Sequence, residues 1–118
     1  MKLDEFFRCV GGDYGEAKAR FQNDERIVRF LGMFPGDDSM QNLTNAMDAG
    51  DTSTAFRAVH TLKGVALNLG LGSLAHMSSQ MTEALRGQDS MPENVQPLYE
   101  AVQKEYAAVR EALEQLEK

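Results

Sequence analysis

Three residues near the middle of the chain, His60, Lys63 and Gly64, have types and spacing that could carry chemistry. Residues three and four positions apart are neighbours on a helix surface, so Lys63 and Gly64 would both lie about one turn from the imidazole. An imidazole can act as a nucleophile near neutral pH. An ammonium group beside it can follow negative charge that arrives on the ring, and phosphate is the group that this pattern favours.

The surrounding stretch, TAFRAVHTLKGVALNL at residues 54–69, has the hydrophobic spacing of an amphipathic helix. Its apolar residues recur at steps of four and three and predict one buried stripe, made of Ala55, Val59, Leu62, Ala66 and Leu69. At about 100° per residue, His60 projects roughly 140° away from the centre of that stripe. We therefore expect the imidazole in or beside solvent, on the same outward side as Phe56 and Leu67.

Each residue of the trio also has a simpler interpretation. A single histidine or lysine on a helix surface is usually an ordinary solvated side chain. A glycine inside an exposed turn costs on the order of 1 kcal/mol relative to alanine, so Gly64 requires a reason. Clearance above His60 is one reason, and the close approach of a neighbouring backbone is another.

The segment HTLKGVALNLG, residues 60–70, resembles the phosphorylated-histidine motif H-x-x-K-G of histidine phosphotransfer (HPt) domains. The similarity extends over residues 27–86 and includes AGD at 49–51 before the motif, and Asn68, Gly70 and Leu74 in or after it. The resemblance implies that His60 accepts a phosphoryl group from the aspartyl phosphate of a receiver domain and passes it to another. Lys63 and Gly64 match the family pattern, as a charge-stabilising group and as steric clearance.

The resemblance also implies the partners, which are response-regulator receiver domains and a hybrid sensor histidine kinase. The receiver would bring Mg²⁺, so no cofactor is expected on this chain. Phe56 and Leu67 leave apolar surface beside His60 and are predicted docking contacts. No phosphate-binding loop or dinucleotide fingerprint occurs in the sequence, so we expect no kinase activity of its own. The alternative function is a helical adaptor that binds signalling proteins without transferring phosphate.

Length and composition predict a single domain over residues 1–118, with 42% hydrophobic and 25% charged residues. The net charge of −6 argues against nucleic acid or an anionic membrane surface as the main partner. The sequence has no run near the roughly 20 apolar residues of a membrane span and no secretory signal at its start, which predicts a cytoplasmic location. We expect Cys9, the single cysteine, to be a buried small hydrophobe.

Hydrophobic periodicity and capping residues predict an all-α fold, an up-and-down four-helix bundle with additional short N-terminal helices. The short helices are expected over residues 3–10, as a lid, from Asp13 to about Phe21, and over 24–34. The bundle helices are expected from residues 37–39 to Gly50, from the cap Asp51 through His60 to Leu69, from Ser73 through Leu85, and from Pro92 to about Leu116.

The spacing of the last helix bears on the oligomeric state, and the position of His76 bears on a metal site. The nearly heptad stripe of the last helix would permit a coiled-coil dimer, but the same stripe is needed to complete the bundle, and we predict a monomer. His76 lies beyond the hairpin turn, about 7 Å lower than His60 at 1.5 Å per residue. We therefore expect His76 to be a surface residue and predict no metal site.

Overall fold

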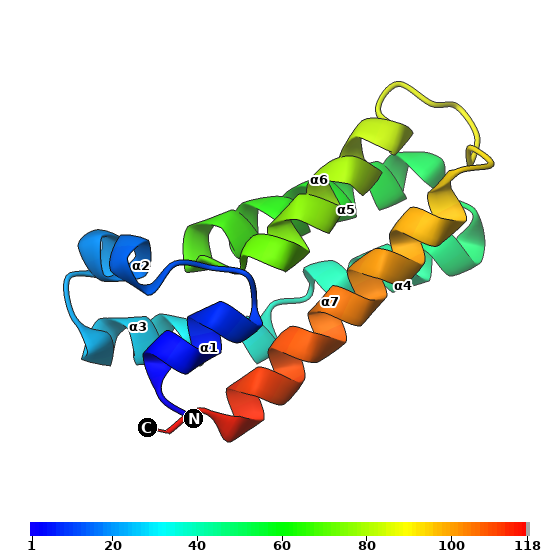
Figure 1. The fold of residues 1–118 in the computed structure, drawn as a ribbon. Helices are drawn as coiled ribbons and strands as arrows, with labels where there is room; N and C mark the ends of the chain where they lie inside the picture. Colours follow the sequence, from blue (N-terminus) through cyan, green and yellow to red (C-terminus); the bar gives the residue numbers. More distant parts are fainter. Residues whose placement is uncertain (118) are drawn as a thin grey trace.

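The computed structural model describes residues 1–117, and these residues are helical without any strand (Figure 1). The helices are α1 (Leu3–Cys9), α2 (Tyr14–Phe21), α3 (Asp24–Leu31), α4 (Ser39–Ala49), α5 (Thr52–Leu69), α6 (Gly72–Leu85) and α7 (Val95–Gln115), with a 3-10 turn, η1, at Phe34–Gly36. The predicted all-α class is confirmed.

Helices α4 to α7 form the bundle, and each packs on the next along the chain. Short turns join α4 to α5 and α5 to α6, so successive helices run in opposite directions, while a longer loop leads from α6 into α7 (Figure 1). The molecule is elongated, with principal dimensions of 43 × 22 × 19 Å. This is the predicted up-and-down bundle, with α1 to α3 as the additional N-terminal helices.

Helix α5 lies at the centre of this arrangement because it packs against both α4 and α6. All five residues of its predicted apolar stripe are buried, and Ala55, Val59 and Leu62 have no exposed surface. Gly70 ends the helix in the left-handed conformation, with φ of 75°. The Gly70 amide donates to the Leu67 carbonyl and the Leu71 amide to the Ala66 carbonyl, which completes a Schellman motif.

The apolar stripe of α7 packs against the core of the same chain. Val102 and Val109 are buried, and Tyr106 packs on Phe34 with 5.3 Å between ring centroids. The near-heptad spacing is therefore explained by completion of the bundle, which needs no second copy. The monomeric state stays a prediction.

Helix α1 covers one end of the bundle, as expected of a lid. Phe6 and Phe7 of α1 are fully buried. The loop after α1 lies against the α5–α6 turn, where the Ser73 amide donates to the Val10 carbonyl at 3.0 Å. The two backbones are so close that a Cβ atom on Gly12 would overlap the carbonyl oxygen of Gly70.

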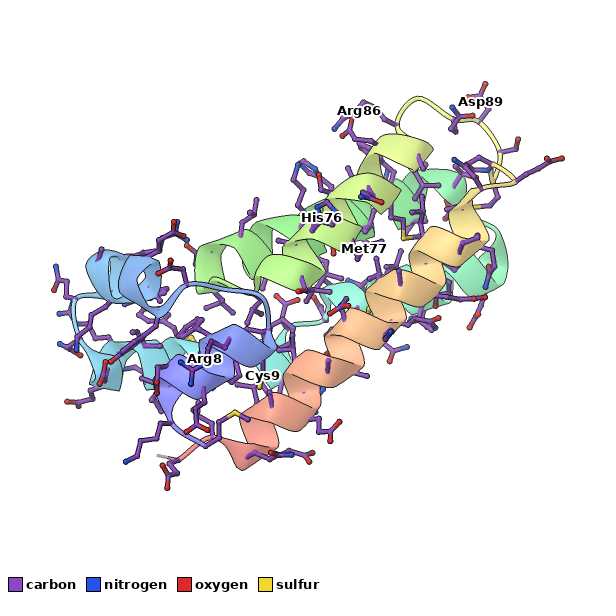
Figure 2. All side chains as sticks on the ribbon, in the orientation of Figure 1. Arg8, Cys9, His76, Met77, Arg86 and Asp89 are labelled. Carbon is purple, nitrogen blue, oxygen red and sulfur yellow. The ribbon has the colours of Figure 1, made fainter. Side chains whose placement is uncertain are left out.

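The prediction that Cys9 is buried was wrong, because the side chain is exposed on α1 (Figure 2). The core side of this short helix is set by Phe6, Phe7 and Val10. At about 100° per residue, Cys9 points roughly 100° away from the middle of that group. Its apolar character does not outweigh its position on the helix.

Two predicted helix boundaries were also wrong. The third helix ends at Leu31 rather than Phe34, because the backbone hydrogen bonds tighten to the 3-10 type after Gly32, with the Met33 amide donating to the Phe30 carbonyl at 3.1 Å, and Pro35 has no amide to continue the helix. The chain continues as η1 instead. The last helix begins at Val95, so Pro92 precedes it and Pro97 occupies its first turn. A proline is tolerated there because the first four amides of a helix have no partner within it.

We predict that Gly12→Ala lowers the free energy of unfolding by about 1–3 kcal/mol, because the new methyl group must push apart two backbones that touch. Chemical denaturation measures the change. Gly36→Ala is the matched control, since its Cβ would meet no atom within 4 Å. An unchanged unfolding free energy in Gly12→Ala would mean that the lid does not press on the α5–α6 turn.

Candidate functional site

His60 projects from α5 on the side opposite the buried stripe, and its side chain is exposed as predicted. Within residues 1–117, no hydrogen-bond partner lies within 3.5 Å of the imidazole nitrogens. A neutral imidazole with an unshared nitrogen lone pair facing solvent can attack an electrophile that approaches from outside.

Phe56 makes the aromatic contact with the histidine. It lies one turn before His60 on α5 and is half-buried. The two rings are nearly parallel, with an interplanar angle of 6° and 6.0 Å between centroids. Such offset stacking restricts the directions in which the exposed imidazole can point.

Lys63 and Gly64 lie one turn beyond His60, as the spacing predicted. Lys63 is half-buried, and among the described residues no carboxylate oxygen lies within 4 Å of its ammonium nitrogen. Gly64 is exposed, and a Cβ atom built on it would meet no atom within 4 Å. This open space excludes the explanation that Gly64 allows a neighbouring backbone to approach, and it leaves clearance above the histidine.

Helix α6 adds two residues that the sequence analysis did not identify, Glu83 and Arg86. Arg86 follows the end of α6, beside the loop to α7 (Figure 2). Its Nη2 and Nε atoms donate to the Glu83 carboxylate at 2.9 and 3.2 Å. Its guanidinium carbon lies 5.2 Å from the centre of the Phe56 ring, within the range of a cation–π contact. Phe56 and Arg86 are equally far from Leu71 in the sequence, and this hairpin register is the signal that could have paired them.

The pKa of Glu83 reflects the charged groups around it. The hydrogen bonds from Arg86 are the main cause that lowers the pKa of Glu83, and the positive charges of Arg86, Lys63 and His60 lower it further, while partial burial opposes them. The carboxylate therefore stays ionised down to more acidic pH than an ordinary glutamate. The site thus combines an imidazole, a lysine and an arginine–carboxylate pair.

The predicted docking residues lie on the same exposed side. Leu67 is 55% exposed, one of the most exposed large apolar side chains in the part of the chain that the structure describes. Arg20 of α2 donates to the carbonyl oxygens of Leu67 and Asn68, both at 2.8 Å, and so fixes the end of α5 beside this residue. Phe56 and Leu67 thus border His60 on two sides along α5.

His76 does not join the site. It is exposed on α6, and its Nε2 lies 2.9 Å from the Gln80 amide nitrogen. Among residues 1–117, no group of three or more histidine, cysteine, aspartate or glutamate side chains is arranged to hold a metal ion. None of the helices in this range is long and apolar enough to cross a membrane.

The fold and the site together define a helical-bundle domain that carries an exposed histidine, with lysine and glycine one turn further, on its central helix. A family model described as Hpt domain matches residues 36–118, well over half of the chain, and the chain therefore belongs to the Hpt domain family. Comparisons with curated proteins and with solved structures gave no match.

Family membership gives the protein a phosphotransfer-related role in two-component signalling, in which Hpt domains have response-regulator receivers as partners. The matched range contains α4 to α7 and every residue from Phe56 to Arg86 described above. Helices α1 to α3 precede it. These three N-terminal helices thus lie outside the matched stretch.

The helix that carries His60 depends on a cap at its start. Asp51 accepts hydrogen bonds from the Thr54 hydroxyl at 2.7 Å and the Thr54 amide at 3.1 Å. These bonds, the hydroxyl first, lower the pKa of Asp51 below its ordinary 3.8. Because the pKa is lowered by folding, the stabilisation is present above 3.8 and is lost as pH falls through the lowered value.

We predict that Asp51→Ala lowers the thermal midpoint near neutral pH, and that this difference from wild type shrinks on acidification below the ordinary aspartate pKa of 3.8. Thermal melts at a series of pH values measure it. Asp51→Asn, which keeps an acceptor oxygen without the charge, should retain most of the stability near neutral pH. A difference between Asp51→Ala and wild type that does not depend on pH would contradict the role of the ionised cap.

Proposed function

We propose that the protein is a phosphorelay intermediate, in which His60 accepts a phosphoryl group from a receiver-domain aspartyl phosphate and transfers it to a second receiver. The observation that supports this most is the exposed imidazole of His60, without a hydrogen-bond partner in residues 1–117, below the open space at Gly64. This arrangement offers a nucleophile and a free path to it.

In the proposed reaction, a ring nitrogen of neutral His60 attacks the phosphorus in line with the bond to the aspartate oxygen. The N–P bond forms, the P–O bond breaks, and its electron pair leaves on the aspartate carboxylate. The other ring nitrogen gives up its proton to water. Transfer to the second receiver reverses these steps. Such reactions depend mainly on alignment and charge stabilisation, and Lys63 supplies charge from this chain while the receiver supplies Mg²⁺.

The surface around His60 suits a receiver domain. Phe56 and Leu67 provide apolar contact, and Gly64 allows the partner's loops to come within bonding distance of the imidazole. A hybrid sensor histidine kinase that carries such a receiver is the proposed donor. The alternative, an adaptor that docks receivers without transfer, would need the same apolar contacts but neither the free imidazole nor Lys63.

We predict that His60→Gln abolishes uptake of phosphate with little change in stability, because the imidazole is exposed and glutamine is no equivalent nucleophile. The assay is incubation with a phosphorylated receiver, followed by detection of acid-labile, base-stable phosphate on this chain. His76→Gln is the matched control, since it removes an exposed histidine of α6. Uptake that persists in His60→Gln would contradict the assignment, and a wild-type chain that binds receivers but takes up no phosphate would favour the adaptor.

We predict that Gly64→Gln blocks transfer and at the same time raises the free energy of unfolding by roughly 0.5–1 kcal/mol. The side chain would enter the approach to His60, while glutamine has a better helix propensity than glycine and meets no neighbouring atom within 4 Å at its Cβ. Denaturation and transfer assays on this variant measure both effects. Undiminished transfer would mean that the receiver approaches His60 from another side.

A further inference from the structure

Arg86 is a charged side chain beside the site that the proposed transfer chemistry does not use, and its carboxylate partner Glu83 is another. Although exposed, Arg86 is held at two points. Three hydrogen bonds of 2.9 to 3.3 Å join its guanidinium group to the Glu83 carboxylate, and the guanidinium carbon lies 5.2 Å from the centre of the Phe56 ring. Attachment at two points restricts the guanidinium group more than a single exposed ion pair would.

The contact leads to the histidine through one aromatic ring. Phe56 contacts Arg86 of the α6 end and also stacks on His60 of its own helix, at 6.0 Å and 6°. The imidazole has no hydrogen bond within residues 1–117, so its stacking on the Phe56 ring is the contact that bears on its orientation. Any group that fixes the Phe56 ring therefore restricts His60 as well.

Orientation matters for this histidine because in-line transfer requires the ring nitrogen to point at the phosphorus atom. An exposed imidazole on a helix surface otherwise samples several rotamers. Arg86 also occupies the carboxylate of Glu83, whose pKa is lowered first by Arg86 and to a smaller extent by the charges of Lys63 and His60. An unoccupied carboxylate at this place could pair with Lys63 and weaken its hold on phosphate.

We propose that Arg86 is a positioning residue for His60: held by Glu83, it fixes the ring of Phe56, and the Phe56 ring orients the imidazole for transfer. The effect on transfer rests on the proposed function, whereas the effect on the ring geometry does not. Arg86 itself contacts no reacting atom in this scheme. It links the end of α6 to the phosphoacceptor on α5.

The test is Arg86→Ala, compared with Arg57→Ala in the full chain. Arg57 is an exposed arginine of α5 near His60, but its guanidinium binds the hydroxyls of Ser53 and Thr54 at 2.8 and 3.2 Å. The control therefore removes a similar charge without touching the Phe56 ring. Two readouts are needed: nuclear Overhauser effects between the ring protons of Phe56 and His60, and the rate of phosphate uptake. Uptake is measured from a phosphorylated receiver and from phosphoramidate, a small donor that requires no docking.

We expect Arg86→Ala to weaken the Phe56–His60 Overhauser effects and to slow uptake from both donors by roughly tenfold, below the ~100-fold that a 1 Å misplacement can cost. Arg57→Ala should leave the Overhauser effects unchanged and the uptake within about twofold of wild type, as a surface charge predicts. Thermal melts verify that both variants fold.

Three results would overturn the inference. The first is unchanged Overhauser effects in Arg86→Ala. The second is slower phosphate uptake by Arg86→Ala from the receiver but not from phosphoramidate, which would make Arg86 a docking contact. The third is equally slow uptake by Arg57→Ala, which would make the effect one of charge alone. A wild-type chain that takes up no phosphate from either donor would refute the proposed function instead, and the Overhauser comparison would still decide whether Arg86 orients the ring.

Discussion

The burial of one face of α5 between α4 and α6 is the constraint on which the rest of the structure depends. Ala55, Val59 and Leu62 lose all their exposed surface, and each fully buried aliphatic side chain of the larger kind contributes about 1.5–3 kcal/mol. Because a helix is rigid about its own axis, fixing this face also fixes the opposite one. His60 is thus held outward by side chains that it never touches.

Contacts at the two ends of α5 also hold the helix in the orientation that points His60 outward. Asp51 caps the start, and the Schellman motif at Gly70 closes the end and turns the chain directly into α6. The glycines at this turn serve a second purpose, since the loop at Gly12 lies against the carbonyl of Gly70. The loop at Gly12 and the side chain of Arg20 therefore both contact the C-terminal end of α5, which carries Leu67.

The chain as a whole carries a net charge of −6, yet Lys63 and Arg86 lie near His60, and the nearby carboxylate of Glu83 is paired with Arg86. Repulsion of an incoming phosphate by the acidic chain is therefore locally offset. Screening shortens the reach of the remaining charges to about 8 Å at physiological ionic strength, so the nearest groups dominate. The site depends on which charges are adjacent rather than on the total.

The amino-acid sequence by itself determined the helix around His60, its outward direction and the positions of Lys63 and Gly64 beside it. These are local properties, because neighbours on one helix are three or four residues apart and the period of the apolar residues sets the buried face. The predicted cap at Asp51 is local in the same sense and is present in the structure, where Asp13 and Asn23 cap α2 and α3 in the same way.

Only the tertiary structure decided the rest of the site and some of the boundaries. The contact of Arg86 with Phe56 depends on the register between α5 and α6, which no periodicity within one helix contains. The start of α7 at Val95 also emerged only in the structure, whereas the exposure of Cys9 follows from the helical period that puts Phe6 and Phe7 on the buried side of α1. The contact between Arg86 and Phe56 joins residues far apart in the chain, so only packing between helices selects it.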